Sequence, residues 1–289
     1  MKPVRLSPVR RLLLRWFDPK RGSPYVSITV TIDVSASLAW LAGLKEAGRA
    51  VSLQSLLIGA VGRLYTEFPQ ANRRIIGGRV YQLPAVGVAA PVNLVGHRGG
   101  DRMDTSMMLL DGVDRLSLVE IDEANRRVVR GERAGRPDNP VIRQMVGLAE
   151  RAPIQAIDQA ISAMNRLHNT PALARLSWKS APVSTAVSNV GASLGDAGAG
   201  RILFRAGSIC LPVRPLHVGS IFGVSYVQDE VIAVDGAPAV RPMLPIIYAF
   251  DHRLFDGHTA ALILTRLAAL LSDPAALFGS DGTRRPESS

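Results

Sequence analysis

Apolar and polar positions alternate along Tyr25–Val34, which predicts a strand with one buried face. Val and Ile take the even positions, while Ser, Thr and Asp take most of the odd ones. The apolar spacing then changes to three and four residues, which predicts a helix capped by Ser35 or Ser37 and ended at Gly48. A second helix is predicted to begin near Ser52.

The later part of the chain predicts several strands and one closing helix. The strand-like runs are Arg79–Leu83, Ala85–Pro91, Val183–Val190, Val218–Val227, Val231–Val234 and Ala239–Phe250. The last two runs flank Asp235–Gly236, a dipeptide typical of tight hairpin turns. Helical spacing is weaker in the middle of the chain and clear at its end: Leu116–Arg130, Val141–Leu148, Ile154–Leu167 and Thr259–Leu271. Strands mixed with helices in this way predict an α/β fold with a mixed sheet.

Composition narrows the class of protein. The chain has 289 residues, of which 47% are hydrophobic, so we expect one large globular domain. The single cysteine, Cys210, excludes an intrachain disulfide and a thiolate zinc cluster, and we interpret it as a small core residue. The longest apolar runs are shorter than the ~20 residues that span a bilayer, and the first residues do not resemble a secretory signal. We therefore expect a cytoplasmic protein.

The net charge of +10 is compatible with three kinds of partner: nucleic acid, an anionic membrane surface, or an acidic substrate such as a CoA thioester. Two basic stretches, Met1–Arg21 and Arg126–Arg151, lack the interleaved aromatic residues of a single-strand platform. We therefore expect no nucleic acid. Peripheral contact with a membrane stays open, beside the plainer interpretation of a solvated basic surface.

Candidate chemistry is concentrated in Asp251–Gly257, which reads DHRLFDG between a predicted strand and a predicted helix. An imidazole titrates near neutral pH, so His252 is suited to act as a general base. Asp256 is suited to fix the loop by pairing with an arginine. The residues alone leave a second interpretation open, in which His252 and Asp256 are buried and hold a turn together. A metal site is not predicted, since no second cluster of ligands accompanies this one.

Several motifs occur together in one order along the chain. Ser188–Gly191 reads Ser-Asn-x-Gly, and the later DHR-x-x-DG motif is followed by a helix and by Asp273–Pro274. In this order the chain resembles the catalytic domain of the acyltransferase components of 2-oxoacid dehydrogenase complexes, of which chloramphenicol acetyltransferases are structural relatives. The resemblance implies a two-layer sandwich of the chloramphenicol acetyltransferase-like type, in which a mixed sheet carries its helices on one face.

The resemblance also implies roles for individual residues. His252 would deprotonate a thiol or hydroxyl that attacks a thioester carbonyl, without a covalent enzyme intermediate. Ser188 would donate a hydrogen bond to the tetrahedral oxyanion. Asp256 would orient the loop through an arginine, for which Arg15 and Arg21 are the candidates. CoA or acyl-CoA is the implied substrate, although no residues that bind it can be singled out.

We divide the chain into a basic segment at 1–24, a catalytic domain at 25–278 with an insertion at about 131–179, and a flexible polar tail at 279–289. We find no lipoyl domain, so we expect no covalently bound lipoyl group on this chain. A homotrimer is implied, with His252 of one subunit meeting Ser188 of the next. The polar tail predicts an assembly that stops at three chains.

Three functions follow from these observations. The first is a stand-alone CoA-dependent acyltransferase with a thiol, hydroxyl or amine acceptor, either a small molecule or a lipid-like one. The second is a catalytically silent scaffold of the same fold, which would bind an acyl carrier protein or a larger assembly. The third is the acyltransferase core of a 2-oxoacid dehydrogenase complex, which would need a separate lipoyl protein.

Overall fold

The structure is a computed structural model that describes residues 2–3, 24–93, 105–134, 136, 153–177, 182–189, 191, 203–209 and 217–285. The helix predicted at Val141–Leu148 lies outside these residues, as do Cys210 and the two arginines expected to pair with Asp256. Within the described part, no helix is both long and apolar enough to cross a membrane.

The main sheet has seven strands in the described part of the chain, in the order β2-β10-β8-β7-β5-β6, with β9 also paired to β10. Their bounds are β2 Tyr25–Asp33, β5 Val88–Asn93, β6 Thr105–Leu110, β7 Thr185–Asn189, β8 Ser220–Val224, β9 Gln228–Val234 and β10 Ala237–Asp251. β7 runs parallel to β5 and β8, and the other pairs are antiparallel. A smaller sheet is formed by β1 Lys2–Pro3, β3 Arg73–Ile76 and β4 Arg79–Gln82.

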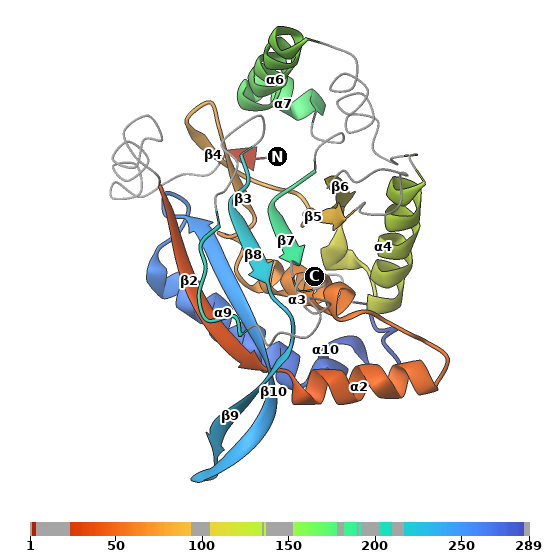
Figure 1. Ribbon diagram of the computed structural model, residues 1–289. Helices are drawn as coiled ribbons and strands as arrows, with labels where there is room; N and C mark the ends of the chain where they lie inside the picture. Colours follow the sequence, from red (N-terminus) through yellow and green to blue (C-terminus); the bar gives the residue numbers. More distant parts are fainter. Residues whose placement is uncertain are drawn as a thin grey trace.

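Helices cover one face of the main sheet (Figure 1). They are α2 Ser35–Glu46, α3 Leu53–Glu67, α4 Leu118–Arg133, α9 Gly257–Ser272 and α10 Pro274–Phe278, with a short 3-10 turn at Val113–Arg115. α6 Ile154–Asn169 and α7 Pro171–Ser177 lie apart from them, near β3. The largest hydrophobic cluster lies between the sheet and the first group of helices. The fold class predicted from the sequence, a mixed sheet with helices on one face, is therefore confirmed.

The starts of α2 and α3 differ in how they are capped. α3 begins beside Ser52, as predicted, and Ser52 caps it because its side chain accepts a hydrogen bond from the backbone N–H of Ser55. The cap predicted for α2 is wrong. Neither serine precedes the helix, and Asp33 instead accepts hydrogen bonds from the backbone N–H and the hydroxyl of Ser35 at 2.8 and 2.6 Å. Gly48 follows α2 with φ +79°, the left-handed conformation expected of a glycine that ends a helix.

β10 is the longest strand in the described part of the chain, and it pairs with three others. Its first half forms a hairpin with β9, and its second half lies between β2 and β8. Asp235 and Gly236 join the hairpin with φ angles of 51° and 80°, which is the backbone of a type I′ turn and confirms the hairpin signal. The hairpin projects from the body of the molecule (Figure 1).

The chain that follows α9 packs back onto the helices. Phe278 is fully buried, and its ring lies beside Gly59 of α3 and stacks on Trp40 of α2. In the next residues, Gly282 is buried and its carbonyl accepts a hydrogen bond from the N–H of Val119 at 3.2 Å. The described start of the segment expected to be a polar tail is thus in contact with α4.

Candidate active site

The turn that carries His252 follows directly from the end of β10. Asp251 is the last residue of the strand, and its N–H donates to the carbonyl of Gly219 at 2.9 Å. The N–H of His252 donates to the carbonyl of Pro24, also at 2.9 Å. The imidazole is half-buried, and its centroid lies 6.1 Å from that of the Phe250 ring. Two neighbouring segments therefore fix the backbone on which His252 stands.

Asp256 lies at the other end of this turn and caps α9. Its carboxylate accepts a hydrogen bond from the N–H of Thr259 at 3.0 Å, and its carbonyl accepts one from Ala260 at 3.0 Å. A carboxylate at this position satisfies a free N–H group and also interacts favourably with the helix dipole. Asp256 therefore determines where the turn ends and the helix begins.

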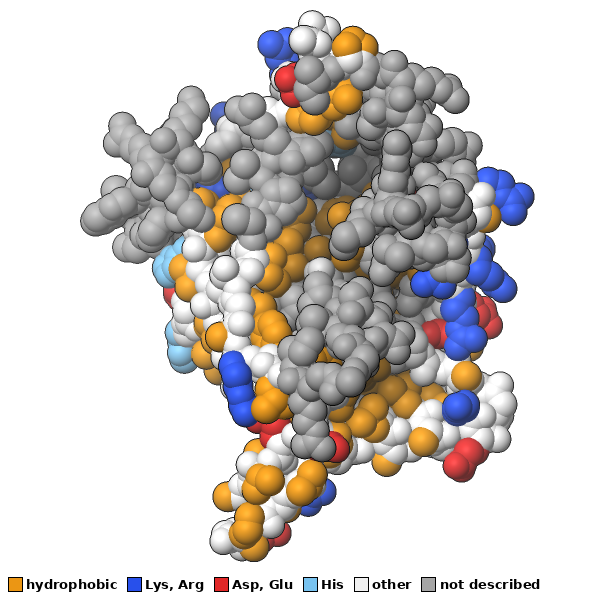
Figure 2. Space-filling view, viewed as in Figure 1, with side chains coloured by type: hydrophobic (Ala, Val, Ile, Leu, Met, Phe, Trp, Pro, Cys, Tyr) orange, Lys and Arg blue, Asp and Glu red, His pale blue; other side chains and the backbone are white. Residues whose placement is uncertain are grey.

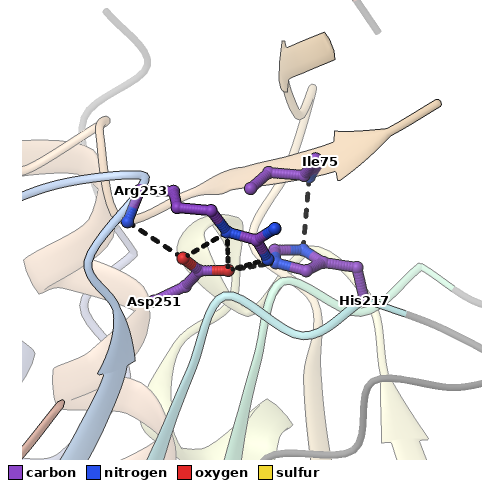
Figure 3. Close-up of polar contacts among 4 residues, drawn as sticks. All are labelled: Ile75, His217, Asp251 and Arg253. Carbon is purple, nitrogen blue, oxygen red and sulfur yellow. Dashed lines mark hydrogen bonds and ion pairs between the residues drawn. The ribbon is translucent and has the colours of Figure 1, made fainter. Parts of the chain in front are cut away.

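A buried polar network lies beneath the turn (Figure 3). The Asp251 side chain is 0% exposed, and its carboxylate accepts hydrogen bonds from the backbone N–H and the guanidinium of Arg253. His217 lies 2.8 Å away from the same carboxylate, measured from Nε2 to Oδ2. Burial alone raises the pKa of Asp251, but the bonds from His217 and Arg253 outweigh it and lower the pKa to about 2.

Sequence reasoning did not find this network. His217 is 34 residues from Asp251 along the chain, so no local spacing connects them. Burial lowers the pKa of His217, and the nearby Asp251 opposes that effect only in part. His217 is therefore a neutral imidazole near pH 7.

Ser188 lies on β7, where the side chain is half-buried. Its neighbour Val187 belongs to the core beneath the helices, while Ala186 belongs to a second apolar cluster. Because side chains alternate along a strand, Ser188 lies on the same face as Ala186, opposite the helices. At the last residue of the strand, the Asn189 side chain accepts a hydrogen bond from the N–H of Gly191 at 2.8 Å, which closes the Ser-Asn-x-Gly turn.

The structure does not bring Ser188 and His252 together within one chain. Ser188 pairs with Gly223 on β8, and Gly223 pairs with Ile247 on β10. His252 comes five residues after Ile247, and β10 is two strands away from β7. With ~3.3 Å per residue and ~4.8 Å per strand, the two Cα atoms are about 19 Å apart. A general base and an oxyanion donor that act on one tetrahedral intermediate must each lie within about 3 Å of its atoms, and a separation of about 19 Å does not allow this.

The face of the sheet that carries Ser188 is built from small apolar residues. Its buried members are Ala89, Val183, Ala186, Val218, Ile221 and Ala249. Gly223 lies among them, and a Cβ added there would clash with the side chain of Ile209. Figure 2 shows hydrophobic side chains at the surface over this part of the sheet. Among the described residues, no group of three His, Cys, Asp or Glu side chains is arranged to hold a metal ion.

The fold is that of the chloramphenicol acetyltransferase-like acyltransferases. A structure of chloramphenicol acetyltransferase superposes with a TM-score of 0.56 at 14% identity, covering 93% of this chain and 99% of that one. A probable dihydrolipoamide acetyltransferase from Listeria monocytogenes superposes with a TM-score of 0.60 at 17% identity, covering 94% of this chain and 95% of that one. The resemblance predicted from the sequence is thus confirmed for the fold.

The sequence match is shorter than the match in fold. Residues 212–279, which contain His252 and Asp256 but not Ser188, match the family described as 2-oxoacid dehydrogenases acyltransferase (catalytic domain). The lipoamide acyltransferase component of the branched-chain alpha-keto acid dehydrogenase complex of Pseudomonas putida is 36% identical over 72 residues, 25% of this chain and 17% of that protein. A Bartonella vinsonii succinyltransferase component of the 2-oxoglutarate dehydrogenase complex is 33% identical over 66 residues, 23% of this chain and 16% of its own length.

Proposed function

We propose that the protein is an acyltransferase that moves an acyl group from CoA to an acceptor thiol, hydroxyl or amine. The observation that carries the proposal is the turn at His252. This turn lies within the residues that match an acyltransferase catalytic domain, and the structure has the same fold as known acetyltransferases. The imidazole stands at the end of the sheet, half-buried, on a backbone fixed by hydrogen bonds.

In the proposed reaction, His252 accepts the proton of the acceptor group as that group attacks the thioester carbonyl. The carbonyl oxygen becomes an oxyanion in the tetrahedral intermediate, and the Ser188 hydroxyl donates a hydrogen bond to it. Collapse of the intermediate breaks the carbon–sulfur bond, and the protonated imidazole returns its proton to the CoA thiolate. Asp256 contributes by fixing the end of the turn at the start of α9.

A related structure supports the choice of residues. A crystallographic and enzymatic study of Azotobacter vinelandii dihydrolipoamide acetyltransferase concerns the roles of one serine, one histidine and one asparagine in its catalytic mechanism. That asparagine comes four residues after the histidine. Here Asp256 comes four residues after His252, so the corresponding position holds a carboxylate that caps a helix.

The proposed site requires two copies of the chain, because Ser188 and His252 of one copy are about 19 Å apart by the strand register. We propose that the copies form a closed ring in which each site takes Ser188 from one subunit and His252 from its neighbour. Cyclic assemblies place the same two surfaces together at every interface. A trimer is the assembly we expect, and light scattering measures its mass directly.

The first experiment measures acyl transfer from a panel of acyl-CoAs to dihydrolipoamide, a hydroxyl compound and an amine, with released CoA quantified by chromatography. The variant His252→Ala should lose at least about a hundredfold in turnover. His258→Ala is the matched control, because His258 is an exposed histidine in the first turn of α9. Wild-type turnover in His252→Ala contradicts the assignment, and no transfer with any acyl-CoA favours a silent scaffold.

The second experiment tests the shared site by mixing chains. Ser188→Ala and His252→Ala are each expected to be nearly inactive as pure proteins. When they are co-assembled in equal amounts, a given interface receives both intact residues in one case out of four, so about a quarter of wild-type activity should return. If the mixture is no more active than its components, each site lies within one chain and the proposed arrangement is wrong.

A further inference from the structure

His217 connects the turn at His252 to a different part of the molecule. Most contacts of the Asp251 carboxylate come from Arg253, which belongs to the same turn. The bond from His217 comes from outside it, and the other ring nitrogen of His217 accepts the backbone N–H of Ile75 at 3.2 Å. Ile75 belongs to β3 of the small sheet, so His217 links that sheet to the turn (Figure 3).

The two contacts assign the tautomer of His217. A backbone N–H can only donate, so Nδ1 of His217 must accept from Ile75 and carries no proton. The proton of the neutral ring is therefore on Nε2, from which it is donated to Oδ2 of Asp251 at 2.8 Å. Both ring nitrogens have a hydrogen-bond partner, and the residue is 6% exposed. The orientation of the ring is fixed from both sides.

The carboxylate that His217 contacts belongs to Asp251, the residue directly before His252. Oδ1 of Asp251 accepts the N–H of Arg253 at 2.9 Å, so the Asp251 side chain reaches across the His252 residue to the next peptide. A rotation of this side chain would release that N–H and change the backbone on both sides of His252. The orientation of the Asp251 carboxylate and the direction of the His252 imidazole are therefore coupled.

We propose that His217 is a positioning residue for His252, acting through its hydrogen bond to the Asp251 carboxylate. The inference rests on the proposed function, in which His252 is the general base. A neutral donor suits this place, because Arg253 already supplies the charge that pairs with Asp251. A second buried cation would add a further desolvation cost. His217 thus orients the Asp251 carboxylate without adding a charge to the network.

Two substitutions separate the contacts of His217. In His217→Gln, the amide nitrogen occupies the place of Nε2 and still donates to Asp251, while the acceptor for Ile75 is lost. In His217→Asn, the amide oxygen occupies the place of Nδ1 and still accepts from Ile75, while the donor to Asp251 is lost. Each variant loses one buried hydrogen bond, so both should be destabilised to a similar extent. The kcat values should nevertheless differ.

We expect His217→Asn to lose at least about tenfold in kcat with little change in KM, because misplacement of the base affects the transition state and not substrate binding. His217→Gln should keep kcat within about threefold of the wild-type value, since it retains the bond to Asp251. Equal losses of kcat in the two variants, or a wild-type kcat in His217→Asn, would overturn the proposal. If His217→Asn does not fold, a tenfold loss of kcat in folded His217→Gln would also overturn the proposal.

A second measurement does not depend on catalysis. Diethyl pyrocarbonate acylates neutral imidazoles, and peptide mass spectrometry gives its rate at each histidine. His258 is exposed on α9 and serves as the internal reference for His252. The ratio of the two rates should change in His217→Asn and stay constant in His217→Gln. An unchanged ratio in His217→Asn refutes the positioning role, whereas an inactive wild-type protein refutes only the proposed function.

Discussion

Removal of the Asp256 carboxylate distinguishes two accounts of what this side chain does. The hydrogen bond from the N–H of Thr259 is lost in Asp256→Ala, which costs about 1 kcal/mol for a helix cap, and the lost charge at the helix N-terminus adds about 0.5 kcal/mol. If Asp256 also neutralises a buried arginine, as the sequence predicts, the loss is about 3–5 kcal/mol. Capping alone and capping with an ion pair therefore differ by a factor of two or more.

The variant Asp256→Asn separates the accounts further, because an amide still caps the helix but carries no charge. For a chain of 289 residues, a loss of about 1.5 kcal/mol lowers Tm by about 2–3 °C at fixed protein concentration. If Asp256 acts as a cap alone, calorimetry should show this shift for Asp256→Ala and less than half of it for Asp256→Asn. Equal shifts in the two variants, or a loss above 3 kcal/mol in either, would refute the capping account.

Three further predictions concern the oxyanion donor, acid stability and the core. Ser188→Ala should lower kcat by about a hundredfold with KM little changed, since a donor to the oxyanion acts in the transition state. A change in KM alone would exclude that role. The pKa of Asp251 is lowered to about 2 from its ordinary value of 3.8, so the stability that this shift contributes is present above about pH 4 and is lost as the pH falls towards 2. The loss is about 2 kcal/mol, measurable by urea unfolding across that range, and an unfolding free energy that does not change with pH contradicts it. Phe278→Ala should cost about 3–5 kcal/mol, because the ring is fully buried, and a loss below 1 kcal/mol in urea unfolding would mean that the segment after α9 is not part of the core.

Local patterns in the sequence predicted much of the described fold. The alternation in β2, the Asp-Gly turn between β9 and β10, and the glycine after α2 each depend on neighbouring residues, and the structure contains all three. β3 was missed, because its four residues begin with Arg73 and Arg74 and do not resemble an apolar strand. Arg74 is nevertheless 2% exposed, a consequence of packing that no local pattern contains.

The candidate site was predicted less completely. His252 and Asp256 share a short motif, so the turn that carries them could be found from the sequence. The contact of His217 with Asp251 depends on how the segment before β8 passes the end of β10, and this path is decided by the sheet. The distance between Ser188 and His252 likewise follows from strand register, which the sequence alone does not specify here.

The position of the His252 turn at the end of β10 has a consequence for how this turn unfolds. The second half of β10 is hydrogen-bonded to strands on both sides, and its even-numbered residues lie in the core. Amide protons in such a strand exchange with solvent only when the whole domain opens. Asp251 is the last residue of that strand, so the start of the turn cannot separate from the sheet by local fluctuation. Heat or denaturant should therefore disrupt this turn in the same cooperative step that unfolds the domain.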